Sequence, residues 1–367
     1  MSERTERGCY IGVDTSNYTT SVALAGEDGW VFHNERLLLP VKAGERGLRQ
    51  SDAVFAHIRH MPTILEGLRA ALFPAGETPW TVRGIGYSAT PRRREDSYMP
   101  CFLTGEAVAL AMRAVTDAPA VAFSHQEGHI MAALYSAAQE LARQETARQE
   151  IARQGADGRV DDLPNAAERT AALMVQDFLA FHVSGGTTDV LAVSPAQIGF
   201  SVSMIGQSLD LHAGQAVDRV GVAMGLPFPC GREMERLAAE FTGKVPKPRV
   251  SVDGMSCHLS GLENLACALY RRTKDAALTS AYTLDFIAET LAAMSEAALG
   301  AYPGRPILFA GGVMSNRRIQ KRLAGRLGEK TKLYFSAPVF SADNAAGIAL
   351  LCRRAVIGQT QSSATTK

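Results

Sequence analysis

The chain has 367 residues, 46% of them hydrophobic and 20% charged, with 38 Lys and Arg against 37 Asp and Glu. This composition is typical of a globular protein and excludes an intrinsically disordered chain. The net charge of +1 excludes a strongly basic protein, so a surface that binds nucleic acid would have to be a local patch. Because a single hydrophobic core stops growing below this length, the sequence predicts two domains.

The sequence carries no recognisable signal for membrane insertion or secretion. Its apolar stretches are all shorter than the roughly 18 residues that a membrane span needs, and the charged residues 1–7 are not followed by an apolar signal segment. The six cysteines have no regular spacing, which indicates reduced thiols rather than disulfides. We therefore expect a cytoplasmic protein without a membrane partner.

The first half of the chain alternates strands with helices. Residues 9–14 and 19–25 have strand composition and are joined by a short turn, which predicts an opening hairpin. Helical periodicity follows over residues 51–73, then a strand over 84–88 and a helix over 103–115. This alternation predicts a mostly parallel sheet.

Two histidines lie four residues apart in Ser124-His125-Gln126-Glu127-Gly128-His129. Positions i and i+4 share one face of a helix, so both imidazoles can bind one metal ion; the alternative is a pair of unrelated surface or core residues. Glu127 lies about 200° around the helix from His125. Ser124 and Glu127 match a capping box, which predicts a structural role for Glu127 rather than that of the water-activating base of a zinc protease.

A polar segment follows the histidine pair. The helix is predicted to continue through residues 140–154, where Ala-Arg-Gln recurs every five residues, and to end in a Gly- and Asp-rich loop over 155–164. A five-residue period is not that of a coiled coil. We assign this segment no chemistry.

The second half repeats the hairpin pattern over residues 177–193, with Ser184-Gly185-Gly186 at the turn. A third apolar strand, 306–313, ends in Gly311-Gly312 and leads into a helix over 316–327. Gly-Gly turns present backbone amides that can surround a phosphate, but they also occur in plain hairpins. Asp14 and Asp189, which follow the first strand and the second turn, can either bind a metal-phosphate unit or simply bond nearby amides.

Two basic segments are candidate contacts for nucleic acid. They are Arg92-Arg93-Arg94 and a stretch of seven Lys and Arg between Arg317 and Lys332. The alternative for both is an ordinary solvated face, and basic residues in the later turns of a helix are also favoured by its dipole. Charge alone leaves the question open.

These motifs together are similar to those of one family. The paired hairpins and the third Gly-Gly turn outline the actin-like/Hsp70-like ATPase (ribonuclease H-like) fold, an α/β fold of two duplicated domains around a nucleotide cleft. Within that class the chain resembles the TsaD family, formerly described as glycoprotein endopeptidases. The matching motifs are Gly12-Val13-Asp14-Thr15-Ser16, residues 125–129, residues 183–187, Gly214 to Val220, Gly225-Leu226-Pro227, Pro229-Cys230-Gly231, Leu259-Ser260-Gly261-Leu262, Gly311 to Asn316, and Asp343 to Ala349.

The resemblance implies an activity and a domain plan. The activity is transfer of a threonylcarbamoyl group from threonylcarbamoyl-AMP to N6 of an adenosine at position 37 of tRNA. The family works with a smaller TsaB-like paralogue and a TsaE-like ATPase as partners. Residues 8–135 with 345–360 would form domain I, 136–172 a polar insertion of helix and loop, and 173–344 domain II.

The resemblance also implies site residues. One divalent metal ion, iron or zinc, would be bound by His125, His129 and Asp343, with Asp14 and Asp343 as catalytic residues. The nucleotide, threonylcarbamoyl-AMP or ATP or AMP, would contact His182, Val183, Ser184, Gly185, Gly186, Asp218, Gly231, Glu235 and Asn316. Two imidazoles and a carboxylate leave open positions on a divalent ion, which can then polarise a carbonyl or phosphate.

His182 falls where some relatives carry a tyrosine near the metal. It is either a fourth metal ligand or a strand residue that faces the interior, and the sequence does not choose between them.

The chain departs from the family pattern at three places. Asn17-Tyr18-Thr19-Thr20 replaces Cys-Asp-Glu-Thr, so two carboxylates are missing near the proposed centre. Residues 90–100 replace a Gly-Pro-Gly-Leu loop, and Glu263 stands where the family has a lysine. These changes indicate a divergent paralogue.

Three functions other than a transferase are compatible with parts of this sequence pattern. A metal- and nucleotide-binding hydrolase or ATPase without tRNA activity would share every retained motif. A metallopeptidase is disfavoured because Glu127 points away from the histidines, and a non-catalytic subunit is disfavoured because the metal ligands are present.

Overall fold

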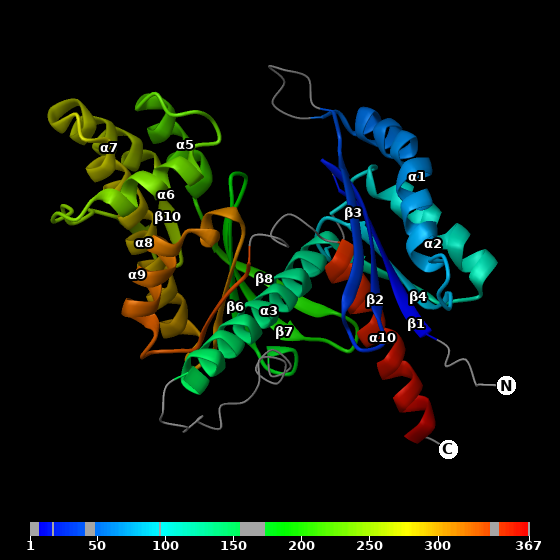
Figure 1. Ribbon diagram of the computed structural model, residues 1–367. Helices are drawn as coiled ribbons and strands as arrows, with labels where there is room; N and C mark the ends of the chain where they lie inside the picture. Colours follow the sequence, from blue (N-terminus) through cyan, green and yellow to red (C-terminus); the bar gives the residue numbers. More distant parts are fainter. Residues whose placement is uncertain are drawn as a thin grey trace. The chain divides into compact units, whose positions relative to one another are not determined.

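The chain divides into two compact units, which are described separately here (Figure 1). The computed structural model describes residues 7–16, 18–40, 48–94, 97–154, 173–337 and 345–365, without the side chains of 144–154 and 360–365. The first unit comprises Met1–Tyr135, Ala196–Phe200 and Ala342–Lys367. The second comprises Ser136–Pro195 and Ser201–Ser341.

The first unit is built on a five-stranded sheet with the order β3-β2-β1-β4-β5. Its strands are β1 (Arg7–Ser16), β2 (Thr19–Gly26), β3 (Val31–Leu38), β4 (Trp80–Thr90) and β5 (Ala120–Ser124). β1, β2 and β3 are antiparallel neighbours, whereas β4 is parallel to β1 and β5 is parallel to β4. The carboxyl ends of β1, β4 and β5 therefore lie at the same edge of the sheet.

Helices cover both faces of this sheet. They are α1 (Gln50–Leu72), α2 (Phe102–Thr116) and α10 (Ala345–Thr365). On β4, Ile85 joins the core cluster that contains Ile64 of α1, while an added Cβ at its neighbour Gly86 would touch Ile348 and Cys352 of α10. Because successive strand residues point to opposite faces, α10 covers the face opposite α1.

Helix α3 (His125–Gln154) follows β5 without a connecting loop. α10 crosses its first turns at close range: a Cβ on Gly347 would lie 2.0 Å from the carbonyl oxygen of Gly128. A glycine at 347 is therefore required for the two helix backbones to approach this closely.

The second unit contains a sheet with the order β12-β11-β6-β7-β8. Its strands are β6 (Phe178–Val183), β7 (Thr188–Pro195), β8 (Phe200–Gln207), β11 (Ile307–Ala310) and β12 (Leu333–Phe335). β6 and β7 are antiparallel, and β11 is parallel to both β6 and β12. A small hairpin of β9 (Ser251–Asp253) and β10 (Ser256–His258) lies outside this sheet.

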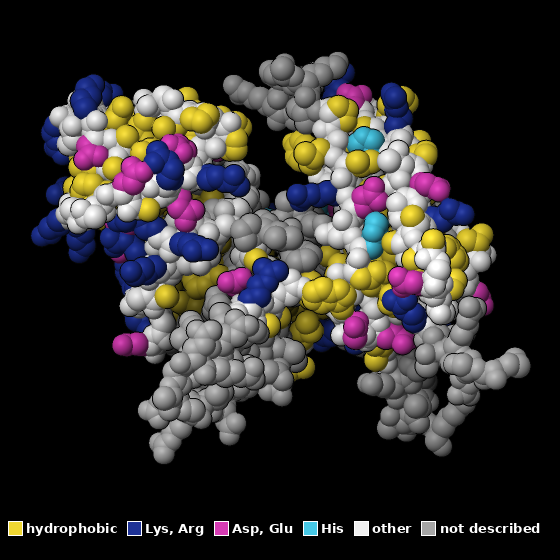
Figure 2. Space-filling view, in the orientation of Figure 1, with side chains coloured by type: hydrophobic (Ala, Val, Ile, Leu, Met, Phe, Trp, Pro, Cys, Tyr) yellow, Lys and Arg dark blue, Asp and Glu magenta, His cyan; other side chains and the backbone are white. Residues whose placement is uncertain are grey.

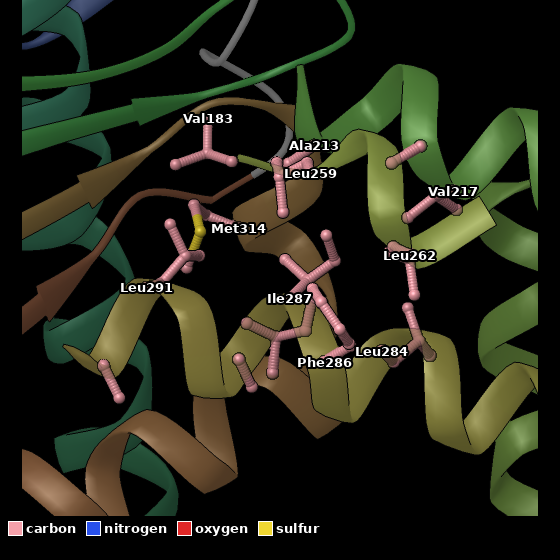
Figure 3. Packing of buried hydrophobic residues seen from close by; sticks show 14 of the residues in the cluster. Val183, Ala213, Val217, Leu259, Leu262, Leu284, Phe286, Ile287, Leu291 and Met314 are labelled. Carbon is pink, nitrogen blue, oxygen red and sulfur yellow. The ribbon is translucent and has the colours of Figure 1, made fainter. Parts of the chain in front are cut away.

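The core of the second unit lies between its sheet and a central helix. Its helices are α5 (Ala213–Ala223), α6 (Gly231–Glu240), α7 (Ser260–Thr273), α8 (Ala276–Ala301), the short η1 (Gly312–Ser315) and α9 (Arg317–Leu327). α8 is buried around most of its circumference, as expected for a helix surrounded by other elements. In Figure 3, Ile287 and Leu291 of α8 point toward Met314 of η1 and Val183 at the end of β6.

The structure confirms most of the predicted elements. Both predicted hairpins form, and the helices predicted at 51–73, 103–115 and 316–327 end within one or two residues of the observed bounds. The expectation of a mostly parallel sheet is wrong, since half of the strand pairs in the first sheet are antiparallel. Tight turns such as that between Ser16 and Thr19 can join only antiparallel neighbours, whereas the helical crossovers give parallel ones.

The helix predicted beyond the histidine pair is confirmed as far as Gln154. Residues 155–172 lie outside the described residues, so the insertion predicted over 136–172 remains a prediction. Among the described residues, none of the helices is long and apolar enough to cross a membrane.

Candidate functional site

Ser124 and Glu127 form the capping box that the sequence predicts at the start of α3. The Glu127 amide donates to Ser124 Oγ at 3.3 Å, while Glu127 Oε2 accepts from the Ser124 amide at 2.9 Å and its hydroxyl at 2.7 Å. The other carboxylate oxygen accepts from the Phe200 amide at 3.0 Å, and Arg93 Nε lies 3.2 Å from Oε2. Glu127 is fully buried and engaged in structure, so it is not placed to activate water.

The two histidines of α3 lie side by side, as predicted. The ring centroids of His125 and His129 are 4.6 Å apart, with the ring planes at 73°. His125 Nδ1 lies 2.8 Å from Asp14 Oδ2 at the carboxyl end of β1. When Nδ1 carries the proton shared with Asp14, the lone pair is on Nε2, and this is the tautomer that binds a metal.

Asp14 is a buried carboxylate held in its charged form. Besides His125, it accepts hydrogen bonds from the Ser16 amide at 3.0 Å and from the Ser88 hydroxyl. Burial alone would raise the pKa of Asp14, but the charge of His125 and the hydrogen bonds from His125, Ser88 and Ser16 outweigh it and lower the pKa. A carboxylate with a lowered pKa is a weak base, so the geometry fits Asp14 to orienting His125.

The third predicted metal ligand, Asp343, lies outside the described residues. Within the described parts of the chain, no group of three or more His, Cys, Asp and Glu side chains could hold a metal ion. The histidine pair nevertheless suits a borderline metal such as iron or zinc, because its first imidazole already has the carboxylate partner that metal-bound histidines usually have. The three-ligand centre remains a prediction with two of its members adjacent.

The Gly-Gly turn of the second unit is shaped by Ser184. Its hydroxyl accepts from the amides of Gly186 at 3.2 Å and Thr187 at 3.1 Å. Gly185 and Gly186 are exposed, and an added Cβ on either would meet nothing within 4 Å. Beneath the turn, an added Cβ on Gly214 would lie 2.7 Å from the Gly185 amide nitrogen. The outer face of the turn is therefore open backbone, which is the surface that a phosphate needs.

The polar residues predicted to hold the nucleotide are engaged in local structure. Asp218 accepts from the Cys230 amide at 2.7 Å, one residue before Gly231 begins α6. Glu235 accepts from the Arg317 amide at 2.8 Å, and Asn316 caps α9 by accepting from Ile319 at 3.1 Å. The structure thus brings Glu235 of α6 next to Asn316 and Arg317, and the ligand contacts of these residues remain predictions.

His182 is half-buried in β6, opposite Asp189 of β7 and beside Ala310 of β11. Its neighbour Val183 is fully buried in the core of the second unit. Both interpretations of His182, as a ligand and as an interior strand residue, stay open.

One polar cluster in the first unit was not predicted. Thr20 Oγ1 lies 2.8 Å from His57 Nδ1 and 3.1 Å from His60 Nδ1, both on α1. Burial lowers the pKa of His57 to about 4, although the Ser16 backbone and Asp14 oppose this shift. The only sequence signal was two histidines three apart in a helix whose other inward residues are apolar.

The two positions at which the family carries carboxylates directly precede Thr20 of this cluster. They are taken by Tyr18, which is exposed, and Thr19, which is half-buried. Glu263, in place of the family's lysine, is paired with Arg219 at 3.2 Å. At Glu263 the family's positive charge is thus replaced by a negative charge that has a partner within the same unit.

The second basic segment is largely neutralised by acidic residues of α8. Buried Asp285 pairs with Arg318 at 2.7 Å and also with Arg322. Farther along, Glu296 pairs with Arg326 at 2.5 Å and Lys330 at 2.6 Å. Figure 2 likewise shows Lys and Arg interspersed with Asp and Glu on the visible face. Four of the seven predicted contacts for nucleic acid are therefore structural ion pairs.

The model of one protein family matches this chain over residues 166–350, which is half of its length, and the family is described as TsaD, tRNA N6-adenosine threonylcarbamoyltransferase. The chain belongs to the TsaD family. Its family is thus one of transferases, and membership confirms the resemblance that the sequence motifs indicated.

Solved structures support the predicted fold class. Full-length HypF in its phosphate- and nucleotide-bound form matches with a TM-score of 0.52 at 9% identity, over 97% of this chain and 55% of that one. HypF from T. kodakarensis matches at 0.50 and 12% identity, over 96% of this chain and 48% of that one. The chain spans about half of HypF and has the predicted actin-like α/β fold.

Proposed function

We propose that this protein transfers a threonylcarbamoyl group from threonylcarbamoyl-AMP to N6 of adenosine 37 in tRNA. The observation that carries the proposal is the contact between Asp14 and His125, one histidine of an adjacent pair, because a carboxylate on one ring nitrogen is the partner that metal-bound histidines usually have. Family membership supplies the reaction class. The proposal includes nucleotide binding, which is supported by the nucleotide-bound form of HypF, a structure of the same fold.

In this reaction the adenosine amine attacks the carbonyl carbon of the mixed anhydride, the bond to AMP breaks, and the amine loses one proton. A divalent ion bound by His125, His129 and Asp343 would supply Lewis-acid polarisation of the donor. Asp14 keeps His125 oriented. In the second unit, the open backbone of Gly185 and Gly186 would receive the donor's phosphate.

The proton of the attacking amine needs an acceptor. Because Tyr18 and Thr19 replace the family's carboxylates, that acceptor is not supplied by this turn. Asp14 is a poor candidate because its pKa is lowered. The reaction itself delivers one basic group to the right place, the phosphate of the departing AMP, and we assign it this role.

The proposal includes protein partners, a TsaB-like paralogue and a TsaE-like ATPase. Its support is a set of exposed apolar side chains on the helices of the first unit: Leu103, Leu110 and Val115 on α2, with Phe55 and Ile58 on α1. Contiguous exposed apolar patches mark protein contacts, and we infer that these five side chains, on two helices that contact each other, form such a patch. An arginine at Leu110 should abolish binding to the paralogue, measured by light scattering, while metal content is unchanged.

The transferase proposal is tested with tRNA that lacks the modification. The purified protein, its partners and the enzyme that makes the donor are incubated with that tRNA, and the modified nucleoside is measured by mass spectrometry. His125→Ala should abolish the product and reduce the metal content. His258→Gln serves as the control, because His258 is a half-exposed histidine of the second unit and is not among the predicted metal ligands.

The second candidate function is a metal- and nucleotide-binding hydrolase without tRNA activity. The loss of both carboxylates at Tyr18 and Thr19 favours it, since this loss affects the acceptor side and leaves the histidine pair intact. Wild-type protein that binds metal and AMP but leaves tRNA unmodified would decide for this alternative, and tRNA would then not stimulate nucleotide turnover.

A further inference from the structure

A cavity of about 960 Å³ lies entirely in the second unit, beside the edge strand β12. One wall is α3 at Ala137, Glu140 and Leu141, and the other is a single face of α9. Figure 2 shows hydrophobic side chains in a recess beside α9. The residues predicted to hold the nucleotide, from Ser184 to Asn316, are not part of its lining. The cavity thus has its own lining, although Ser315 and Arg317 flank Asn316, one of the residues predicted to hold the nucleotide.

One end of the cavity lies at the carboxyl ends of two adjacent parallel strands. Ser315 and Arg317 come shortly after β11, and Ser336 directly follows β12. The Ser336 amide donates to Phe309 of β11 at 2.9 Å, which fixes these two strand ends side by side. Open α/β sheets bind their ligands at this edge, beyond the carboxyl ends of the strands.

Two buried hydroxyl groups at this end have no hydrogen-bond partner. They are Ser315 Oγ and Ser336 Oγ, for which the described residues supply neither a donor nor an acceptor. Ser336 is only 2% exposed. Leaving a buried hydroxyl unpaired costs about 1–3 kcal/mol, so two in one cavity indicate groups that bond to something other than the described residues.

Arg317 is a cation at this end of the cavity. Acidic residues of α8 neutralise cations elsewhere on α9, but Arg317 has no ion pair among the described residues. Lys332, also without an ion pair among them, precedes β12 and therefore lies at the opposite end of that strand. Arg317 also stands at the amino end of α9, where the helix dipole is positive. The acidic lining residues are Glu140 and Glu329. Glu329 is next to Lys330, whereas Glu140 lies one helical turn beyond Ser136, whose hydroxyl accepts from the Ala337 amide at 2.6 Å. A carboxylate is therefore present near this end as well.

Part of the cavity lining is apolar. It includes Leu141, Leu333, Phe335 and Ala324. Ala324 of α9 and Gly328, directly after this helix, are small residues that leave space. A ligand with a charged head and an apolar body matches this lining.

We propose that this cavity binds a small organic anion with a phosphate or carboxylate head and an apolar body. The head contacts the Arg317 guanidinium and the hydroxyls of Ser315 and Ser336. The body lies over Leu333 and Phe335. The site adds a second ligand to the molecule and does not depend on the transferase activity.

The test uses the full chain and two aromatic probes, 1-naphthyl phosphate and 1-naphthoate, titrated calorimetrically in saturating AMP so that the nucleotide site is filled. The phosphate and carboxylate arms show which head the site prefers, and 1-naphthalenemethanol is the uncharged control. Binding at about 1 mM or tighter is expected for at least one anion. Arg317→Gln should weaken it about tenfold or more, and Lys321→Gln, the same charge change on α9 outside the cavity, should not alter it.

Ser336→Ala separates a ligand contact from a structural role. Removing an unpaired buried hydroxyl should leave the melting temperature unchanged or raise it, whereas probe affinity should fall about two- to tenfold. The inference is overturned if neither anion binds, if Arg317→Gln binds as tightly as wild type, or if AMP displaces the probe. It is also overturned if Ser336→Ala unfolds the protein without affecting the affinity of the folded fraction.

Discussion

The histidine pair of the first unit and the Gly-Gly turn of the second are positioned in opposite ways. His125 is oriented by a buried carboxylate that itself accepts three hydrogen bonds. The turn at Gly185 and Gly186 is open, and the polar side chains around it are occupied by amides of the same unit. The first unit therefore presents side-chain chemistry prepared by burial, whereas the turn of the second unit presents bare backbone. Substitutions in the first unit should accordingly cause the largest losses of stability and of metal affinity.

The largest effect on stability is expected from Glu127→Ala. This change removes a buried cap and leaves the amides of Ser124 and Phe200 without their acceptor, for a cost of about 3 kcal/mol. Urea unfolding measures it, with exposed Glu66→Ala as the control. If Glu127 were a catalytic base instead, Glu127→Gln would abolish activity in a protein of normal stability.

Asp14→Asn should affect metal binding next. Losing the carboxylate that orients a histidine ligand typically weakens metal affinity about 10- to 100-fold, or roughly 1.4 to 2.7 kcal/mol. Competition with a chelator gives the affinity. Asp253→Asn, at an exposed position of the second unit, is the matched control. Equal affinity in wild type and Asp14→Asn would contradict the orienting role.

His57 should make the protein less stable in mild acid. Its folded pKa of about 4 lies below the value of 6.5 that applies when it is unfolded, so the unfolded chain binds more protons between these values. Stability is therefore full above about pH 6.5 and falls toward pH 4, by about 2 kcal/mol between pH 7.5 and pH 5. The free energy of unfolding, measured with urea at several pH values in this range, should depend less steeply on pH for His57→Gln than for His258→Gln. Parallel slopes would mean that burial does not lower the pKa of His57 in the folded protein.

Substitutions at two glycines of the second unit separate the effect on stability from the effect on nucleotide binding. Gly214→Ala would place a methyl group against the Gly185 backbone and should cost about 1–2 kcal/mol. Gly185→Ala meets open space, so the melting temperature should be unchanged while AMP affinity falls about tenfold. A calorimetric titration with AMP makes the comparison. Normal AMP binding by a stable Gly185→Ala would remove the turn from the nucleotide site.

The smallest effect is expected from Arg326→Gln on α9. Its ion pairs with Glu289 and Glu296 lie near the surface, where such pairs contribute about 0.5 kcal/mol and less at high salt. The melting temperature in low and high salt measures this. Because the side chain is already paired, tRNA affinity should not change, and a clear loss of affinity would restore this helix as a nucleic-acid surface.

Local signals in the sequence were sufficient for much of the fold. Ser124 and Glu127 gave the start of α3, and the Gly-rich turns located both hairpins, because capping and turn formation depend on residues close in the chain. The direction of the strand pairs was less accessible. A periodic pattern marks a strand but does not give its neighbours, so the mixed sheets were expected to be mostly parallel.

Site residues that lie on one turn of a helix could be predicted from the sequence. Contacts between residues from distant segments could not. The histidine pair follows from spacing alone. The contacts of Asp14 with Ser88 and His125 join the ends of three parallel strands, and no local pattern reports such a meeting. Asp343 lies outside the described residues, so its role is still carried by the resemblance alone.

Gly347 gives the motif at residues 343–349 a second meaning. Its missing side chain sets the gap between α10 and the turn of α3 that lies between the two histidines, since a methyl group there would overlap the Gly128 carbonyl. The distance between the two helix backbones therefore influences where the imidazoles of His125 and His129 lie. Gly347→Ala would force the two helices apart and should weaken metal binding, although residue 347 contributes no ligand atom. Helix α10 therefore influences the metal-binding chemistry of the first unit through backbone packing alone.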